Sequence, residues 1–422
     1  MLTLACAEAL ARKGLIAAIS RNGCIMTVQD TPVPRLRRYQ GPAVLSYGFR
    51  PFFLLGSAYA GLAVLAWLPV FLGELTLQTA FAPRDWHVHE MAYGYLPAII
   101  TGFLFTAIPN WTGRLPIQGM PLLALVIVWI LGRLAVTCSV SIGWLAALLI
   151  DVSFLTLITA AAAREILAGR NWRNLTVVAL VALLLGGNIA FHLEAHFAGA
   201  AEYGVRAGIA VIVLLIALIG GRIIPSFTRN WLVRENPGRL PSPFAKFDVA
   251  VVILSAVALL MWVVHQDGLL IGVLLALIGV LNVIRLGRWA GDRTSRERLV
   301  LILHVGYAFI PAGFLLGAAS AFNLVPASAG IHAWMVGAAG VMTLAVMTRA
   351  SLGHTGQPLT ASAFTQGIYA AVVIAALARV CAVMASAWSH LLLYLAAVAW
   401  AAAFLGFAVY FGQLLMSETK RR

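Results

Sequence analysis

Histidine is the residue of this chain best suited to chemistry, and its nine copies are unevenly placed. Neutral imidazole is the commonest metal ligand in proteins and suits haem iron, copper and zinc. His87 and His89 precede Glu90 at the start of a long apolar stretch. Near the end of another apolar stretch, His192 and His196 are four residues apart. Together these spacings predict metal or cofactor binding, although any single histidine is more simply explained as a polar residue at a membrane boundary.

The elements that must position these histidines are transmembrane helices. Hydrophobic residues make up 62% of the 422 residues and charged residues only 10%. Apolar stretches of about twenty residues recur to the C-terminus, as in polytopic membrane proteins. The sequence therefore predicts an all-α fold, with residues 1–45 as an N-terminal cytoplasmic extension and residues 46–422 as one transmembrane domain. Turn and charge signals divide that domain into twelve spans: 52–72, 87–108, 120–139, 143–163, 174–196, 204–224, 246–265, 268–287, 299–321, 331–349, 363–385 and 389–414.

The formal net charge of +14 has a topological explanation. All but four of the 29 Lys and Arg fall in the N-terminal arm, in the tail, or in the connections after spans 2, 4, 6, 8 and 10 and the span ends beside them. Because Lys and Arg collect in cytoplasmic loops, we expect an inner (plasma) membrane protein with both termini in the cytoplasm. The positive charge is dispersed over short loops rather than concentrated on a soluble face, so nucleic acid is excluded as a partner.

Cysteine offers no competing cofactor chemistry. The four cysteines are scattered, with no CxxC and no CxxCH motif. Those motifs are typical of thiolate metal sites and of covalently attached c-type haem. Any haem in this protein is therefore expected to be held non-covalently, as haem b is.

On the predicted topology the histidines concentrate at one membrane boundary. Seven lie at the outer ends of spans: His87, His89, His192, His196, His265, His332 and His390. A random scatter would divide them between the two boundaries, so the set favours a metal or cofactor site near the outer face. His304 and His354 belong to the cytoplasmic half, where His354 is a further metal candidate in a Gly-His-Thr-Gly turn.

Helical spacing assigns partners to these histidines. Four residues apart, His192 and His196 share one helical face and could bind one ion together. Two residues apart, His87 and His89 point to opposite sides of a regular helix and should serve different partners. A single helix cannot supply both axial ligands of a haem. We therefore expect His332 of span 10 to pair with His87 or His89 as a haem site.

Charged residues inside the spans have open alternatives. Glu90 and Glu194, next to histidines, are candidate catalytic proton relays, with structural hydrogen bonding or support of an imidazole as the equal alternative. Arg379 suits a haem propionate, although Glu194 or a lipid phosphate would serve as well. Arg133 and Asp151 are expected at similar depth in adjacent helices, which favours a buried ion pair over a proton path.

A second pattern marks the cytoplasmic ends of three spans. Thr112, Thr228 and Thr348 end spans 2, 6 and 10 at nearly equal separations, with Pro and Arg close by. This spacing suggests three pseudo-repeats of four helices, in which spans 2, 6 and 10 occupy equivalent central positions. The alternative is chance, because Pro, Thr and Arg are ordinary residues at helix ends.

Several ordered motifs from about residue 45 to the end of the chain resemble the NnrS family. They are Phe49-Arg50-Pro51-Phe52-Phe53, Trp86-His87-Val88-His89-Glu90-Met91, Asn110-Trp111-Thr112-Gly113, Gly220-Gly221-Arg222-Ile223-Ile224-Pro225, and His332 through Met347-Thr348-Arg349 to His354-Thr355-Gly356. The resemblance implies a bacterial inner-membrane protein that contains haem and copper and is connected with denitrification and nitric oxide tolerance. It places the family's histidine motifs on His87, His89, His332 and His354, without saying which histidine binds iron and which copper.

Twelve spans with histidines on the second and tenth also resemble the catalytic subunit I of haem-copper oxidases, which is an analogy of fold only. Those enzymes have ligands on their sixth and seventh helices, whereas span 6 here has no histidine. We therefore expect copper at His192 and His196. The first expected function is reductive removal of nitric oxide by a haem oxidoreductase. Its expected partners are nitric oxide, membrane lipid and an electron donor that the sequence does not identify. The alternatives are a nitric-oxide sensor or protective binding protein without turnover, and a secondary transporter.

Overall fold

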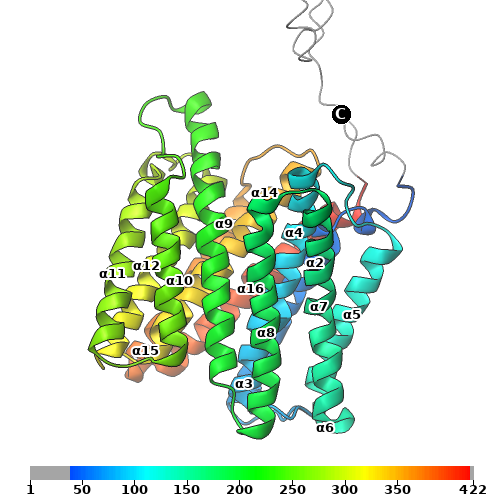
Figure 1. Ribbon diagram of the computed structural model, residues 1–422, viewed down its shortest axis with the longest axis vertical. Coiled ribbons are helices and arrows are strands. Elements are labelled where there is room, and N and C mark those ends of the chain that lie inside the picture. The colour runs from blue at the N-terminus through cyan, green and yellow to red at the C-terminus, as the bar shows by residue number, and fades with distance from the viewer. Residues whose placement is uncertain (1–38, 419–422) are drawn as a thin grey trace, which may run out of the picture. The chain divides into compact units, whose positions relative to one another are not determined.

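The computed structural model describes residues 39–418. This part of the chain consists of long helices joined by loops and a few short helical segments (Figure 1). No strand occurs in the described range. Twelve helical segments are long and apolar enough to cross a membrane. They comprise α2 (Phe49–Phe71), α3, η3 and α4 as one segment (Pro83–His89, Glu90–Tyr95 and Leu96–Thr112), α5 (Met120–Thr137), α7 (Trp144–Ala168), α8 (Leu175–Phe197), α9 (Tyr203–Glu235), α10 (Lys246–Val264), α11 (Leu269–Gly287), α12 (Arg298–Ala321), α13, η6 and α14 as one segment (Ala327–His332, Ala333–Gly340 and Val341–His354), α15 (Ala363–Met384) and α16 (Ser389–Met416).

The all-α fold and the twelve predicted spans are therefore confirmed. The predicted N-terminal extension, residues 1–45, lies outside the described residues except for its last few. A short helix, α6 (Ser139–Ile142), joins α5 to α7. Spans 2, 6 and 10 are among the most enclosed, with 78%, 67% and 67% of the residues in their most apolar window buried. These three spans are thus the most enclosed of the twelve, while the three pseudo-repeats stay a prediction.

One predicted boundary is wrong. Span 6 was expected to end at residue 224, before Pro225, but α9 continues to Glu235 with Pro225 inside it. A proline inside a helix removes one hydrogen bond and crowds the carbonyl four residues earlier. Here that carbonyl belongs to Gly221. The helix nevertheless continues through Pro225, so the Ile-Pro pair does not mark its end.

Spans 2 and 10 share an unusual backbone. Each changes from α-helix to π-helix directly after a histidine, at His89 in span 2 and at His332 in span 10. π-helical segments are rare, and they are frequent at functional sites because they turn side chains and carbonyls away from the regular helical positions. In span 2 the Trp129 indole donates a hydrogen bond to the Gly94 carbonyl within this segment, at 2.9 Å.

The ends of these two spans also correspond. The helix of span 2 ends at Thr112, followed by Gly113 with φ of +67°, and span 10 ends before Gly356 with φ of +72°. Thr112 and Thr355 each bond the carbonyl four residues earlier. When span 2 is aligned with span 10 on the histidines that precede their π-helices, Thr112 corresponds to Thr355. The predicted counterpart, Thr348, lies about two helical turns earlier. The predicted register failed because Thr348 lies inside the helix.

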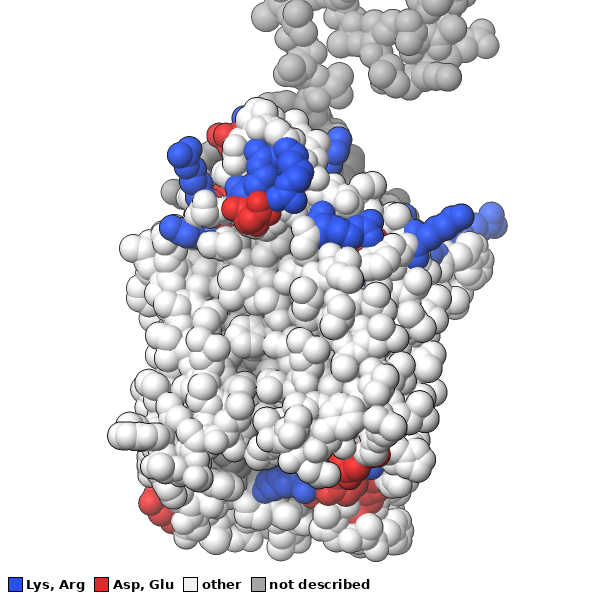
Figure 2. All heavy atoms as spheres, turned by 90° about the vertical axis from the view of Figure 1, so that its left-hand side faces the viewer, with Lys and Arg blue, Asp and Glu red and all other residues white. Residues whose placement is uncertain are grey.

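Charged side chains gather at the two ends of the helices. Figure 2 shows one face, on which Lys and Arg collect at one end, acidic residues accompany a smaller basic area at the other, and uncharged residues fill the region between. We call the first end, where spans 2, 4, 6, 8 and 10 finish, the basic end. The other, where α3 and α6 lie in Figure 1, is the histidine end. This arrangement is that of a multi-pass membrane protein.

Candidate functional site

A cluster of polar side chains is buried between spans 1 to 5 near the histidine end. We call it the buried cluster; it consists of Tyr59, His89, Glu90, Arg133, Asp151, Asn188 and His192. His89 and Glu90 are fully enclosed, and Asp151 and Asn188 are 1% exposed. Polar and charged groups at this depth are costly unless each is paired. Each residue of the buried cluster has at least one such partner within the cluster.

Arg133 joins the two carboxylates of the cluster. Its guanidinium donates to Glu90 Oε1 at 2.6 Å and forms an ion pair with Asp151. The predicted ion pair between Arg133 and Asp151 is therefore confirmed, and Glu90 is a second partner that the sequence did not indicate. Gly94 makes the approach possible, because a Cβ atom there would lie 2.5 Å from Nη1 of Arg133.

His89 is held by hydrogen bonds on both ring nitrogens. Its Nδ1 lies 3.0 Å from Glu90 Oε1, and its Nε2 lies 3.0 Å from Asn188 Oδ1 and 3.2 Å from Asp151 Oδ2. An ionised carboxylate can only accept a hydrogen bond, so Nδ1–H donates to Glu90. Asn188 Oδ1 and Asp151 Oδ2 are acceptors as well, so Nε2–H also donates, and the imidazole is held as the protonated form between two carboxylates. Glu90 thus orients the His89 imidazole. This is the structural role that the sequence analysis gave as the alternative to a proton relay.

His192 completes a group that could hold a metal ion. Its Nε2 lies 3.1 Å from Asp151 Oδ2, and one ligand atom each from His89, Asp151 and His192 lie within 4.8 Å of one another. His196 is not part of this group. It stacks on Trp144 with ring centroids 4.0 Å apart and is exposed. The expected pairing of His192 with His196 is therefore not formed, because only His192 lies on the part of α8 that faces the other helices.

A second set of residues lies between spans 1, 2, 10 and 11 at the histidine end, and we call it the outer triad: His87, His332 and Arg379. His87 stacks on Trp67, with ring centroids 4.2 Å apart. The charge of Arg379 acts on both imidazoles, and His87 also acts on His332. His87 and His89 therefore have different partners, as their spacing predicted. The electrostatic interaction of His87 with His332 is compatible with the predicted pairing, which stays a prediction.

Both histidines of the outer triad keep ring nitrogens that no protein group uses. The Nδ1 atom of His87 is buried without a hydrogen-bond partner among the described residues. In His332, Nδ1 lies 2.6 Å from the Ser328 carbonyl, to which it must donate. The lone pair of His332 is consequently on Nε2. An imidazole oriented by a backbone carbonyl in this way is the usual arrangement of a metal ligand.

Arg379 is half-buried inside α15, and within residues 39–418 it makes no ion pair or hydrogen bond. The suggested partner Glu194 is engaged elsewhere. Its carboxylate accepts hydrogen bonds from the backbone N–H groups of Glu202 at 2.7 Å and Gly204 at 3.1 Å. Glu194 thereby satisfies free N–H groups at the start of α9.

Tyr95 and Thr343, with hydroxyl oxygens 2.5 Å apart, link spans 2 and 10 deeper in the bundle.

These contacts predict a structural role for Glu194. Glu194→Ala should lower the free energy of unfolding by about 1 kcal/mol, as loss of a helix cap does, without changing cofactor content. Thermal unfolding in detergent, followed beside metal and haem analysis, measures both. Glu194→Gln, which keeps one acceptor oxygen, is the matched control and should lose less. An unchanged stability combined with a loss of proton-dependent activity would instead restore the relay assignment.

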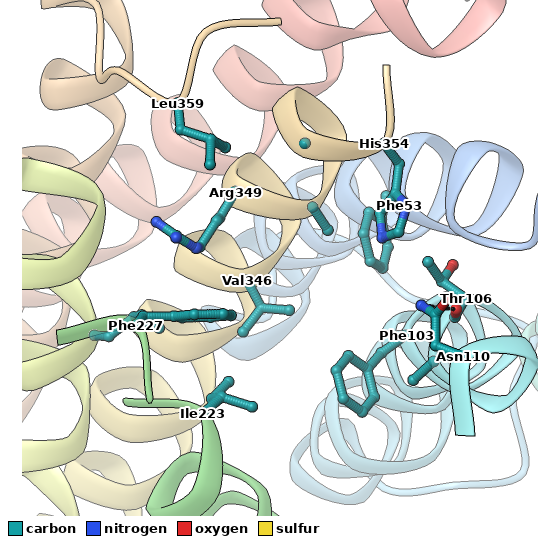
Figure 3. Close-up of a pocket in the computed structure, with 14 residues that line it drawn as sticks. Phe53, Phe103, Thr106, Asn110, Ile223, Phe227, Val346, Arg349, His354 and Leu359 are labelled. Carbon is teal, nitrogen blue, oxygen red and sulfur yellow. Dashed lines mark hydrogen bonds between the residues drawn. The ribbon is translucent and has the colours of Figure 1, made fainter. Parts of the chain in front are cut away.

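His354 lies far from the other metal candidates, at the basic end of span 10. The helix from His332 to His354 places them roughly 30 Å apart. His354 lines a cavity of about 340 Å³ between α2, α4, α9, α12 and α14 (Figure 3). Arg349 projects from one wall over the Phe227 ring, 4.1 Å from its centroid, while Asn110 lies on the opposite wall. The motifs of spans 2, 6 and 10 at the basic end thus converge on one largely apolar cavity.

Sequence reasoning missed contacts of two members of the buried cluster. Asp151 was assigned only to an ion pair, although a carboxylate inside a membrane span is by itself a functional signal. Asn188 lies one turn from His192 on α8, and its contact with Asp151 reaches another helix, α7. Its Nδ2 donates to Asp151 Oδ2 at 2.8 Å. Trp67 carried no signal, because tryptophan near helix ends is common in membrane proteins.

Comparison with known proteins agrees with this architecture. The model of the family described as NnrS protein matches residues 43–418, nearly the whole chain. No curated protein matches the chain.

Proposed function

This chain belongs to the NnrS family, and we propose that it is a haem- and copper-containing protein of nitric oxide metabolism that removes nitric oxide by reduction. The observation that carries the proposal is the outer triad. The charge of Arg379 acts on the imidazoles of His87 in span 2 and His332 in span 10, and residues 39–418 offer Arg379 no hydrogen bond or ion pair.

The residues of the outer triad fit haem b. Imidazole from two helices can approach the iron from two sides, whereas one helix cannot supply both ligands. His332 presents Nε2 as its free lone pair, and His87 has a buried nitrogen that is otherwise unsatisfied. Arg379 offers planar paired donors, which match the geometry of a propionate carboxylate. Trp67, stacked on His87, restricts the rotation of that ring.

Bound haem would supply the iron chemistry for binding and reducing nitric oxide, with His87 and His332 as the residues that would hold it. The protein contributes position and surroundings. Nitric oxide is small and apolar, so it partitions into the bilayer and reaches a site between helices without a charged pathway. Two nitric oxide molecules, two electrons and two protons give nitrous oxide and water, and the electrons come from an external donor. Glu90, held by Arg133 and His89, is assigned to support of His89.

We also propose that the basic end faces the cytoplasm and that the protein lies in the inner membrane. The gathering of Lys and Arg at that end supports this orientation. The outer triad would then lie near the periplasmic face.

Turnover by the purified, haem-replete protein tests the proposal. With excess chemical reductant, nitric oxide should disappear faster than in the buffer control, and one nitrous oxide should form for every two nitric oxide molecules lost. A nitric oxide electrode and gas chromatography of the headspace follow the two gases. His390→Ala, an exposed histidine at the same end, should be as active as the wild type.

Two other outcomes would overturn reduction as the function. A haem spectrum that shifts with nitric oxide, without nitrous oxide formation, would indicate a sensor or protective binding protein. A protein with no haem that moves a solute across proteoliposomes would indicate a transporter.

A further inference from the structure

A cavity at the basic end has no part in the proposed function. We call it the basic-end cavity; its volume is about 340 Å³, and it lies between α2, α4, α9, α12 and α14 (Figure 3). Helices far apart in the chain therefore build it together. Ile223 of span 6 and Val346 of span 10 line it and are only half-buried, although these spans are among the most enclosed. A cavity of this size inside a helical bundle is within the range of small-molecule sites.

The walls of the basic-end cavity are mostly apolar. Phe53, Phe103 and Phe227 line it from α2, α4 and α9, and Leu303 and Val346 line it from α12 and α14. These side chains favour a ligand with an apolar body, because contact between them removes apolar surface from water. The volume is at the lower end of the range for ligand pockets. The cavity therefore fits one hydrocarbon chain better than two.

Arg349 gives the cavity a positive charge without a bonded anion. Its guanidinium lies over the Phe227 ring, and it makes no hydrogen bond or ion pair within residues 39–418. The charge of Glu297 acts on Arg349 without forming an ion pair. That carboxylate caps α12, where it accepts a hydrogen bond from the Leu299 N–H at 3.0 Å. A half-buried guanidinium with free donors is stabilised by an oxyanion, because its paired N–H groups match a carboxylate or a phosphate.

Two exposed polar side chains, His354 and Asn110, lie across the cavity from Arg349 (Figure 3). His354 makes ring contacts with Tyr47 and Phe49. Within the described residues it belongs to no group of three side chains that could hold a metal ion. These exposed groups mark the side on which the cavity opens. The Lys and Arg that gather at the basic end would attract an anion towards this opening.

We propose that the basic-end cavity binds an amphipathic anion, with its oxyanion head paired to Arg349 and one apolar chain against Phe53 and Phe227. A long-chain carboxylate has this chemistry, and so does an anionic phospholipid that inserts its phosphate and part of one chain. A neutral ligand such as a quinone would fill the cavity but leave Arg349 without an anion. The proposal goes beyond the proposed function, because this site lies roughly 30 Å from the outer triad along span 10.

Native mass spectrometry of the full-length protein in a neutral detergent, titrated with oleate, tests the site. The wild type should bind one oleate per chain. Arg349→Gln should bind it roughly 10- to 100-fold more weakly, which is the factor that a hydrogen bond to a charged group contributes. Arg229→Gln is the matched control, because it removes the same charge from an exposed position on α9, and it should bind as the wild type does. Equal affinities of the two variants would overturn the proposal.

The wild type alone decides the matter if Arg349→Gln fails to fold. Oleyl alcohol has the chain of oleate without its charge, and it should bind at least ~10-fold more weakly. Equal binding of the alcohol, or tighter binding of a neutral short-chain quinone, would overturn the proposal. Ala350→Leu narrows the cavity but keeps Arg349, so it should also weaken the binding of oleate. Unchanged binding in that variant would place the oleate elsewhere and refute the site.

Phosphatidylglycerol in the same titration identifies the source of the head group. Tighter binding of phosphatidylglycerol than of oleate, lost in Arg349→Gln, would indicate a membrane phospholipid. The reverse order would indicate a free carboxylate, and either result supports the site. Binding of both that is independent of Arg349 would refute it.

The haem content of the same samples separates this proposal from the proposed function. A wild type without haem that binds oleate through Arg349 would refute the proposed function and leave the basic-end cavity as a ligand site. A wild type that reduces nitric oxide but binds neither anion would refute only the ligand site.

Discussion

His332→Ala is expected to abolish haem binding. The alanine removes the only imidazole of span 10 at this boundary, together with the Nε2 lone pair that the Ser328 carbonyl orients. His87→Ala should lose haem as well, because the proposed site needs both imidazoles. The haem content per chain, from the pyridine haemochrome, and the Soret band before and after nitric oxide measure the change.

Suitable controls lie at the same boundary. His265→Ala and His390→Ala remove exposed histidines that contact neither member of the pair, and both should keep the haem content of the wild type. Normal haem in both His87→Ala and His332→Ala would refute the outer triad as the haem site. Loss of haem in all four variants would show a general effect of instability, which thermal unfolding in the same detergent would reveal.

Arg133→Met is expected to cost the most stability of any single substitution considered. The change leaves Glu90 and Asp151 buried without their shared cation. Breaking a buried ion pair by removing one partner costs about 3–5 kcal/mol, because the remaining charge is uncompensated. The free energy of unfolding, from thermal or denaturant unfolding of the purified protein, should fall by that amount. Methionine is close to arginine in length, so the change tests the charge more than the packing.

A double variant checks the cause of this loss. In Arg133→Met with Asp151→Asn, one of the two uncompensated carboxylates is gone, so part of the stability should return. Arg84→Ala serves as the control, because Arg84 and Glu202 form an exposed ion pair whose loss should cost less than about 1 kcal/mol. Equal losses in Arg133→Met and Arg84→Ala would mean that the buried cluster does not depend on its charges.

The number and order of the spans could be predicted because hydropathy acts locally along the chain. A helix such as α10 needs only its own apolar residues to enter a bilayer. Loop charges likewise act locally. Prediction failed where a local signal has two meanings, as at Pro225, which ends many helices but lies inside α9. It failed also for the π-helices after His89 and His332, which no residue pattern announced.

For the candidate site, spacing along one helix was sufficient to separate His87 from His89, because side chains two residues apart point to different sides. The same rule placed His192 and His196 on one face, and yet only His192 reaches a partner. Which residues of a face are covered depends on the neighbouring helix. That information lies in α7, which brings Asp151, and not in α8.

The sequence by itself therefore determined an all-α membrane protein with twelve spans, histidines at one end and basic residues at the other, since each depends on residue type and position along the chain. Only the tertiary structure decided that Asp151 joins His89 to His192, that Glu90 supports an imidazole, that Glu194 caps α9, and that Arg379 lies beside His87 and His332. These contacts unite residues far apart in the chain, and they depend on the rotation of each helix about its axis, which packing against several neighbours sets.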